Sequence, residues 1–176
     1  MIFIDTSAVI AMIAAEPDGP LLAAKLQRED ECISAGHVIL EASMRLATLL
    51  RLTPTADALV RRLFREAGAA IVPISEEIAH TSVIAFERYG KGRNRAALNT
   101  ADCLSYACAK VHGARLLFKG GDFAHTDICQ GLMAAEGLSR CRGGKFAAPC
   151  ESRLRAAAVG FQAEKALSKK PRKINT

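Results

Sequence analysis

Four acidic side chains stand where the surrounding sequence is apolar. Asp5 directly follows the apolar residues 2–4, and Asp122 comes shortly after another apolar run. Glu41 and Asp102 each lie inside a stretch whose apolar residues have helical spacing. An isolated carboxylate is costly to remove from water, so each of these acids needs a partner or a chemical role. Several carboxylates together favour a hard divalent cation such as Mg²⁺ or Mn²⁺.

Two of these acids have an equally simple structural explanation. Glu41 lies four residues before Arg45, a spacing that pairs opposite charges on one helix face for roughly a few tenths of a kcal/mol. Asn99 can cap the helix that follows it, which makes Asp102 the third helical residue in an arrangement close to a capping box. Neither acid can be given a chemical role from its local sequence alone.

Asp5 and Asp122 have structural alternatives as well. Asp5 can be the N-cap of the helix that follows it, and Asp122 can be a turn residue after two glycines. Taken together, however, the four acids lie beside apolar segments with few cations near them. Clustered carboxylates repel one another and stay ionised together only when a cation holds them. Because a bound divalent cation orients phosphate esters and activates water, the set points to phosphodiester hydrolysis.

The elements that must position these acids alternate between strand and helix patterns as far as about residue 125. The patterns predict strands at residues 2–4, 32–34, 69–74 and 114–119. They predict helices at residues 7–15, 21 to about 28, 36–51, 55–68, 75 to about 88, and 98–113. This order is typical of an α/β fold with a parallel sheet covered by helices. Sites in such sheets form at the carboxyl ends of the strands, so Asp5 and Asp122 should share one edge.

The basic character of this chain belongs to its C-terminal part. The whole chain has a formal net charge of +6, but residues 136–176 alone contain ten basic and three acidic residues, a net charge of +7. Residues 1–135 therefore carry −1, and their charge gives no support for nucleic-acid binding. We expect one domain over residues 1–128 and a basic C-terminal extension over residues 129–176, weakly helical or disordered and without its own core.

The sequence predicts neither membrane insertion nor secretion. No run approaches the ~18 apolar residues of a membrane span, and no basic segment precedes the apolar N-terminal stretch as in a signal peptide. The six cysteines form no Cys-x-x-Cys pair and no Cys/His cluster with zinc spacing, and Cys103 and Cys108 have the pattern of buried thiols. We therefore expect a cytoplasmic protein in a reducing environment.

Four motifs in a fixed order carry a family resemblance. They are MIFIDTSAVIAMI (1–13), ISAGHVILEASMRL (33–46), ERYGKGRNRAALNTADCLSYACAK (87–110) and LLFKGGDFAHTDI (116–128). In these motifs the chain resembles the PIN-domain ribonucleases, and specifically the VapC-type toxins of bacterial type II toxin–antitoxin systems. The resemblance implies a three-layer α/β PIN domain with a central parallel sheet. It also implies an endoribonuclease that depends on Mg²⁺, with Mn²⁺ as a substitute.

The resemblance assigns roles to individual residues. It implies that Asp5 and Asp102 are the principal metal ligands, and that Glu41 and Asp122 complete an acidic pocket. Three polar neighbours also match the family pattern: Thr6, Ser7 and Asn99. The partners that follow from the resemblance are an RNA substrate, a cognate antitoxin protein and a second copy of the chain in a homodimer.

Two features depart from the family pattern. The family often has Asp or Asn at the position of Gly121, so metal binding and activity are weaker here if the missing side chain contributes a ligand. Typical members end soon after Asp127, which we expect to be structural, whereas this chain continues to Thr176. The arginines of this extension could reach the acidic pocket and inhibit the protein in cis.

Other readings of the sequence stay open. The main one is a catalytically lapsed PIN fold that only binds RNA or a partner. A metal-free ribonuclease would use the 2′-hydroxyl and histidines, although single histidines are more often structural groups. The chain has His37, His80, His112 and His125. The cations Lys91, Arg93 and Arg95 could contact phosphates beside the site, but a solvated loop explains them equally well.

Overall fold

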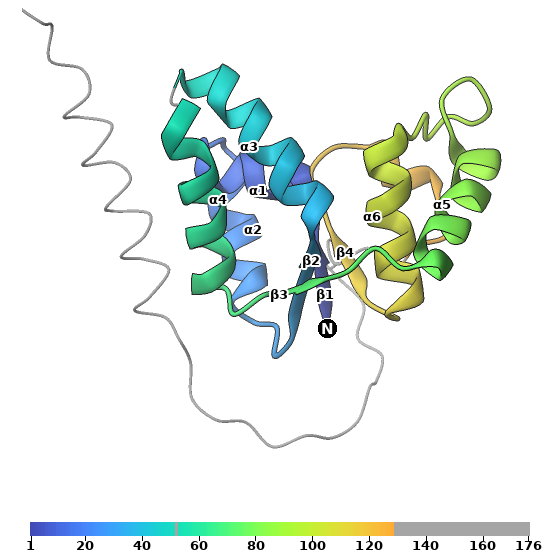
Figure 1. The fold of residues 1–176 in the computed structure, drawn as a ribbon, viewed down its shortest axis with the longest axis horizontal. Helices are drawn as coiled ribbons and strands as arrows, with labels where there is room; N and C mark the ends of the chain where they lie inside the picture. The colour runs from blue at the N-terminus through green and yellow to red at the C-terminus, as the bar shows by residue number, and fades with distance from the viewer. Residues whose placement is uncertain (52, 129–176) are drawn as a thin grey trace, which may run out of the picture.

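Four short strands form the centre of the computed structural model, which describes residues 1–51 and 53–128 (Figure 1). They are β1 (Ile2–Ile4), β2 (Cys32–Ala35), β3 (Ala70–Val72) and β4 (Arg115–Leu117). Their order across the sheet is β3-β2-β1-β4, and every neighbouring pair is parallel. Because parallel strands all end on the same side, the residues that follow β1 and β4 meet at one edge.

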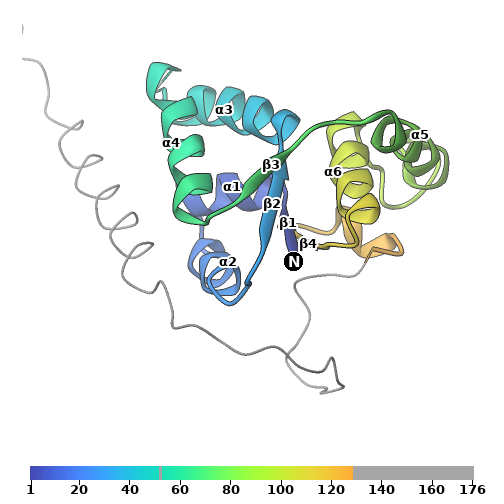
Figure 2. The same ribbon diagram turned by 60° about the horizontal axis from the view of Figure 1, so that its bottom comes forward.

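Helices cover both faces of this sheet. They are α1 (Thr6–Ile13), α2 (Gly19–Leu26), α3 (Gly36–Leu50), α4 (Thr53–Glu66), α5 (Glu76–Tyr89) and α6 (Thr100–Val111), with a 3₁₀ helix η1 (Asp122–His125) near the end of the described part. Two views show α1 to α4 on one side of the sheet and α5 and α6 on the other (Figure 1, Figure 2). The predicted three-layer α/β architecture is confirmed.

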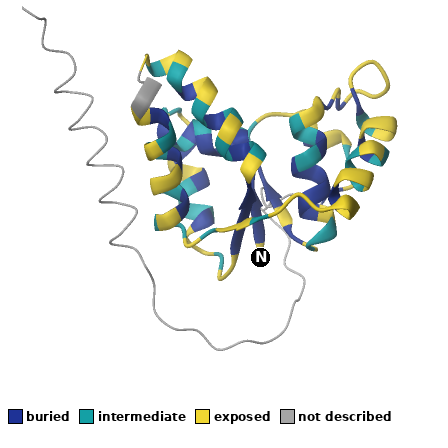
Figure 3. Ribbon diagram, viewed as in Figure 1, coloured by how far each residue is buried: buried dark blue, intermediate teal, exposed yellow. Residues whose placement is uncertain are grey.

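The strands are apolar because both faces of the sheet are covered. All of β1 is fully buried, and Phe3 at its centre lies opposite Ile33 of β2 and Leu116 of β4. Buried residues follow the strands and the inner sides of the helices (Figure 3). Continuous apolar runs of this kind are usual in parallel sheets, whereas a sheet with one wet face would show alternation.

Some element boundaries differ from the sequence prediction. The edge strand β3 stops at Val72, because Pro73 cannot donate to a strand ladder. Helix α3 stops at Leu50, where Arg51 adopts a left-handed conformation with φ of 54°. Helix α4 begins at Thr53 rather than at the predicted residue 55. Pro54 therefore lies in its first turn, where its missing N–H has no helical partner to lose.

Residue 52 and residues 129–176 lie outside the described part of the chain. The expected basic C-terminal extension falls there, so its structure and the domain boundary at residue 128 stay predictions. Within residues 1–51 and 53–128, no helix is long and apolar enough to cross a membrane. Cys103 and Cys108 are buried free thiols as predicted, and Cys32 is a third.

Candidate active site

The end of β1 presents Asp5 as the N-cap of α1. Only 3% of Asp5 is exposed, and its Oδ2 accepts hydrogen bonds from the backbone N–H (2.9 Å) and the hydroxyl (2.6 Å) of Ser7. The Ser7 oxygen in turn accepts a 2.9 Å hydrogen bond from the backbone N–H of Lys119, just beyond β4. Ser7 thereby orients the Asp5 carboxylate and ties together the ends of two neighbouring strands.

Glu41 reaches the same edge from the second turn of α3. Its Oε2 accepts a 2.8 Å hydrogen bond from the hydroxyl of Thr6, the residue after Asp5. Its Oε1 lies 3.4 Å from Nε of Arg45, so the predicted i,i+4 pair is present as well. Because the Arg45 side chain is 63% exposed, this pair contributes little to stability. The bond from buried Thr6 is what places Glu41 beside Asp5.

Asp102 is held by a complete capping box at the start of α6. Asn99 Oδ1 accepts the Asp102 N–H at 3.1 Å, and Asp102 Oδ2 accepts the Asn99 N–H at 2.8 Å. Burial raises the pKa of the Asp102 carboxyl to about 6; the hydrogen bond from Asn99 opposes the rise, and the charges of Asp5, Asp122 and Glu41 add to it. The charges of three acids from other elements therefore reach Asp102 across the carboxyl ends of the strands.

Asp122 is exposed and forms the first residue of η1. The segment that carries it is anchored on both sides. Lys119 forms ion pairs with two acidic residues that follow α1, and the buried ring of Phe123 packs against Phe118 with the ring centroids 5.0 Å apart. The ion pairs of Lys119 connect residues about a hundred positions apart, so nothing in the local sequence identified them.

We call these four residues, Asp5, Glu41, Asp102 and Asp122, the acidic pocket. Within residues 1–51 and 53–128, no three acidic, histidine or cysteine side chains lie close enough to form a preassembled metal site. Burial is the main cause of the raised pKa of Asp102, and the remaining cause is repulsion by the charges of the other three acids. A divalent cation would relieve it, and an all-oxygen donor set suits Mg²⁺ or Mn²⁺. The residues therefore fit such an ion, while their roles as ligands stay a prediction.

The sequence of the described domain is similar to that of known proteins. The family model described as "PIN domain" matches residues 2–128. The chain is 39% identical over 131 residues to ribonuclease VapC30 of Mycobacterium tuberculosis, which covers 71% of this chain and 94% of that relative. It is also 39% identical over 125 residues to a ribonuclease VapC of Mycolicibacterium smegmatis, with 71% and 95% covered. The chain is a VapC-type member of the PIN-domain family.

A solved structure shares the PIN fold. VapC20 of Mycobacterium tuberculosis, described as a toxin that cleaves the sarcin–ricin loop, superposes with a TM-score of 0.60. The superposition covers 74% of this chain and 98% of the VapC20 chain. The sequence identity is 16%, so this likeness concerns the fold alone. The two relatives that are 39% identical to this chain are named as ribonucleases, and neither likeness favours the alternative of a lapsed PIN fold.

Asp127 serves the structure of the PIN domain. Its Oδ1 accepts a hydrogen bond from the hydroxyl of Tyr106, and its Oδ2 pairs with Nζ of Lys110 at 3.0 Å. The hydrogen bond from Tyr106 is the main reason why the pKa of Asp127 is lowered. Both partners lie on α6, so Asp127 fixes the last described residues to that helix. These contacts support a structural role for Asp127 rather than a role in the acidic pocket.

His37 is a packed group rather than a free base. Its Nε2 lies 3.1 Å from the hydroxyl of Ser105, and its ring stacks on Phe3 with centroids 6.2 Å apart. Burial lowers the pKa of His37, and the charge of Asp5 only partly opposes that effect. A neutral imidazole with these neighbours gives no support to the metal-free histidine mechanism.

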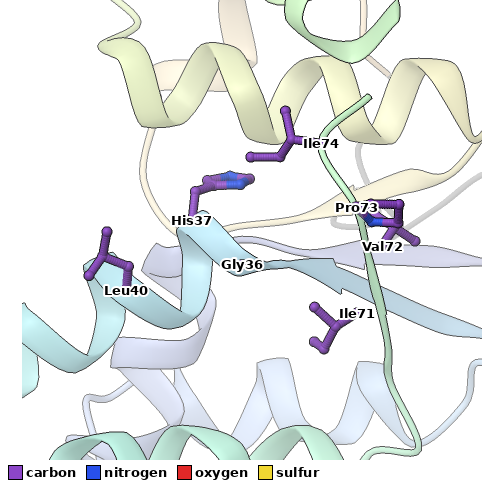
Figure 4. A pocket seen from close by; sticks show the side chains of 7 residues that line it. All are labelled: Gly36, His37, Leu40, Ile71, Val72, Pro73 and Ile74. Carbon is purple, nitrogen blue, oxygen red and sulfur yellow. The ribbon is translucent and has the colours of Figure 1, made fainter. Parts of the chain in front are cut away.

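An apolar groove lies between the start of α3 and the edge strand β3. It is lined by Gly36, His37, Leu40, Ile71, Val72, Pro73 and Ile74 (Figure 4). Three of its side chains are well exposed: Leu40 at 63%, and Ile71 and Ile74 at 45% each. Sequence reasoning missed this groove, because an apolar residue at an interface and one in the core have the same sequence pattern.

Proposed function

We propose that this protein is the toxin of a toxin–antitoxin pair and that it hydrolyses phosphodiester bonds in RNA. The observation that carries the proposal is that the hydroxyl of Thr6 joins Glu41 to the end of β1, where Asp5 caps α1. The charges of Asp5, Glu41 and Asp122 also reach Asp102 and add to its raised pKa. The similarity to ribonucleases of the VapC type supports the proposal, since two of them are 39% identical to this chain over most of their own length. The protein acts in the cytoplasm, where thiols such as Cys32 and Cys103 stay reduced.

The acidic pocket binds Mg²⁺ or Mn²⁺ in this proposal, with Asp5 and Asp102 as the principal ligands. A bound ion would polarise the scissile phosphate and activate water. Ser7 and the capping box hold these two carboxylates in fixed orientations before the ion arrives. Glu41 and Asp122 orient the attacking water and accept its proton. Attack on phosphorus in line with the leaving 3′ oxygen produces a 3′-hydroxyl and a 5′-phosphate.

The acidic pocket also explains how a cognate antitoxin inhibits the protein. A pocket of four carboxylates is a receptor for a cationic side chain, which competes with the metal ion. Arginine is the better candidate because its planar guanidinium pairs with a carboxylate through two hydrogen bonds. The antitoxin therefore inserts an Arg, or less effectively a Lys, between Asp5 and Asp102.

We further propose that two copies of the chain associate through the apolar groove and the exposed apolar side chains next to it. These side chains are Leu40, Met44, Ile71 and Ile74. Large exposed apolar patches commonly mark protein interfaces. Leu40→Glu together with Ile74→Glu should convert a dimer to a monomer in size-exclusion chromatography with light scattering. Leu21→Glu, on an exposed residue of α2, is the control and should leave the mass unchanged.

Cleavage of RNA by the purified chain tests the proposed activity. EDTA should abolish cleavage, and Mg²⁺ or Mn²⁺ should restore it. Asp5→Asn and Asp102→Asn should each reduce the rate by at least about a hundredfold while the fold stays intact, because each removes a charged ligand and relieves charge repulsion. Asp127→Asn, outside the pocket, is the matched control and should retain the rate.

The chemistry of the product ends decides between mechanisms. Ends with 5′-phosphate support metal-dependent hydrolysis. Ends with 2′,3′-cyclic phosphate, formed in EDTA, contradict it and indicate attack by the 2′-hydroxyl. A wild-type chain that binds Mn²⁺ in the acidic pocket but cuts no RNA indicates the lapsed fold.

A further inference from the structure

The segment between α5 and α6 is a tightly built loop, residues 90–98, which we call the basic loop. Backbone hydrogen bonds from the Leu98 N–H to Tyr89 O (2.9 Å) and from the Lys91 N–H to Leu98 O (3.1 Å) close its two ends. The side chain of Asn94 accepts the N–H of Ala96 at 3.0 Å. Ala96 and Leu98 are both fully buried. The loop is therefore fixed to the body of the domain.

Close packing on α5 adds to this fixation. A Cβ atom on Gly90 would lie 2.4 Å from the carbonyl oxygen of Phe86 and 2.5 Å from its ring, so only glycine permits this approach. Gly92 has a φ of +81°, which favours glycine as well. The guanidinium of Arg93 lies over the Phe86 ring, 5.0 Å from its centroid. The loop thus presents its side chains from a defined backbone.

The basic loop concentrates positive charge that is not neutralised nearby. It carries Lys91, Arg93 and Arg95, all exposed, and no acidic residue. None of the three forms an ion pair with another residue of the described ranges. Six basic residues outside the loop form ion pairs. They are Arg45, Arg61, Arg62, Lys110, Arg115 and Lys119.

This positive segment adjoins the start of α6, the helix that carries Asp102. The loop leads directly into Asn99 and the first turn of α6, where Asp102 is held. Figure 1 shows the connection from α5 at the same end of α6 as that first turn. An RNA strand with one phosphate at the acidic pocket must bring its neighbouring phosphates close to four negative charges. Cations beside the pocket are needed to offset that repulsion.

We propose that the basic loop binds backbone phosphates of the RNA strand next to the scissile bond, mainly through Lys91 and Arg95, with Arg93 oriented by Phe86. The proposal rests on RNA as the substrate of the acidic pocket. These contacts carry no base specificity, because phosphates are common to all sequences. They fix the register of the strand and lower KM, while the acidic pocket sets kcat.

Binding of a short, fluorescein-labelled single-stranded RNA to the full chain in EDTA tests this without cleavage. Lys91→Gln combined with Arg95→Gln should weaken binding about tenfold at low salt and reduce the slope of log K against log salt by about 1.4, since each phosphate contact on a single strand contributes about 0.7. In cleavage assays with metal, the same variant should raise KM with little change in kcat.

Arg28→Gln combined with Arg65→Gln is the matched control. Both residues are exposed and lie before β2 and β3, at the opposite edge of the sheet, and the variant removes the same charge. Its affinity and salt slope should match those of the wild type. Equal losses of RNA affinity in both double variants overturn the proposal, because the loss then follows from the change in net charge and not from the position of the residues. Loss confined to the loop variant in a chain that cuts no RNA supports the loop site and contradicts only the proposed activity.

Discussion

The hydroxyl of Thr6 donates a 2.8 Å hydrogen bond to Oε2 of Glu41, across 35 positions of sequence. Thr6 is the first residue of α1 and is almost fully buried, whereas Glu41 comes from α3. The bond therefore joins two helices at the carboxyl edge of the sheet. It also holds the Glu41 carboxylate at this edge, although its other partner, Arg45, is exposed to solvent.

Thr6→Val keeps the shape of this side chain and removes the donor. We expect a loss of about 1 kcal/mol in the free energy of unfolding. If the same energy positions Glu41 during catalysis, the cleavage rate should fall about fivefold. Chemical denaturation and RNA cleavage measure the two effects. Thr48→Val, which removes an exposed hydroxyl bonded to the Met44 carbonyl, is the control, and an equal loss of activity there contradicts the positioning role of Thr6.

The raised pKa of Asp102 predicts a pH-dependent stability in the absence of metal. The folded chain holds the Asp102 proton between pH 3.8 and about 6, where the unfolded chain has released it. The folded state binds more protons in this window, so the contribution of Asp102 to stability is present at low pH and is lost as the pH rises through about 6. Asp102→Asn should remove this decline and raise the melting temperature at neutral pH in EDTA. The amide oxygen can still accept the Asn99 N–H, so the cap is kept.

Addition of Mg²⁺ or Mn²⁺ provides the internal control for this pH experiment. The cation should restore the stability of the wild type at neutral pH and have little effect on Asp102→Asn. A melting temperature that is independent of pH between 3.8 and about 6 in EDTA contradicts the electrostatic account of the acidic pocket.

Tyr106→Phe separates structural acids from those of the pocket. This change removes the donor to Asp127 and leaves the packing of the ring against Tyr89, where the centroids lie 5.6 Å apart. We expect a loss of about 1 to 2 kcal/mol in the free energy of unfolding, because the acceptor is charged but Asp127 remains partly solvated. The cleavage rate of the folded fraction should stay within about twofold of the wild type. A large loss of rate without a loss of stability assigns Asp127 to the chemistry instead.

The sequence predicted the fold because the features it depends on are local. Apolar runs at residues 2–4 and 32–34 are short strands that lie inside a covered sheet, and Ser75 caps α5 as its position before two glutamates indicates. The boundaries were less certain because neighbouring elements compete for the same residues. Pro54 is the example, since it belongs to the start of α4 rather than to the end of α3.

The candidate site was predictable in its residues but not in its contacts. A sequence spacing determines which groups share a helix face, and the pair of Glu41 with Arg45 was predicted in this way. The bond from Thr6 to Glu41 and the ion pair of Lys119 with Glu16 depend on how distant elements pack, so no spacing predicts them. The apolar groove was missed for the same reason.

Gly121 offers a way to strengthen the acidic pocket. It has a φ of −105°, and a Cβ atom there would meet nothing within 4 Å, so a side chain can be added without strain. Gly121→Asp should increase the affinity for Mn²⁺, measured by calorimetry, because it adds an oxygen donor beside Asp122. Gly120→Asp is the contrasting variant, since its φ of +102° disfavours a side chain and should lower the melting temperature. Unchanged Mn²⁺ affinity in a well-folded Gly121→Asp chain contradicts the idea that this glycine weakens the site.

The opposite charges of the two parts of the chain predict inhibition in cis. Residues 136–176 carry a net charge of +7 and the first 135 residues carry −1. An arginine of the extension that enters the acidic pocket takes the place of the metal ion, so a shorter chain ending at Gln130 should cut RNA faster than the full chain. The difference should shrink as salt is added, because screening weakens an exposed ionic contact.

A full-length variant tests whether charge or length is responsible for that difference. It replaces four basic residues near the C-terminus with glutamine: Lys169, Lys170, Arg172 and Lys173. If only these charges inhibit, this variant should match the shorter chain in rate; an intermediate rate assigns part of the effect to Arg140, Arg142, Arg153 or Arg155. Equal rates of the full and shorter chains at low and moderate salt contradict inhibition in cis. A rate and an RNA affinity that both fall on shortening identify the extension as an RNA-binding arm, because a basic segment that contacts phosphates adds to affinity in a salt-dependent way.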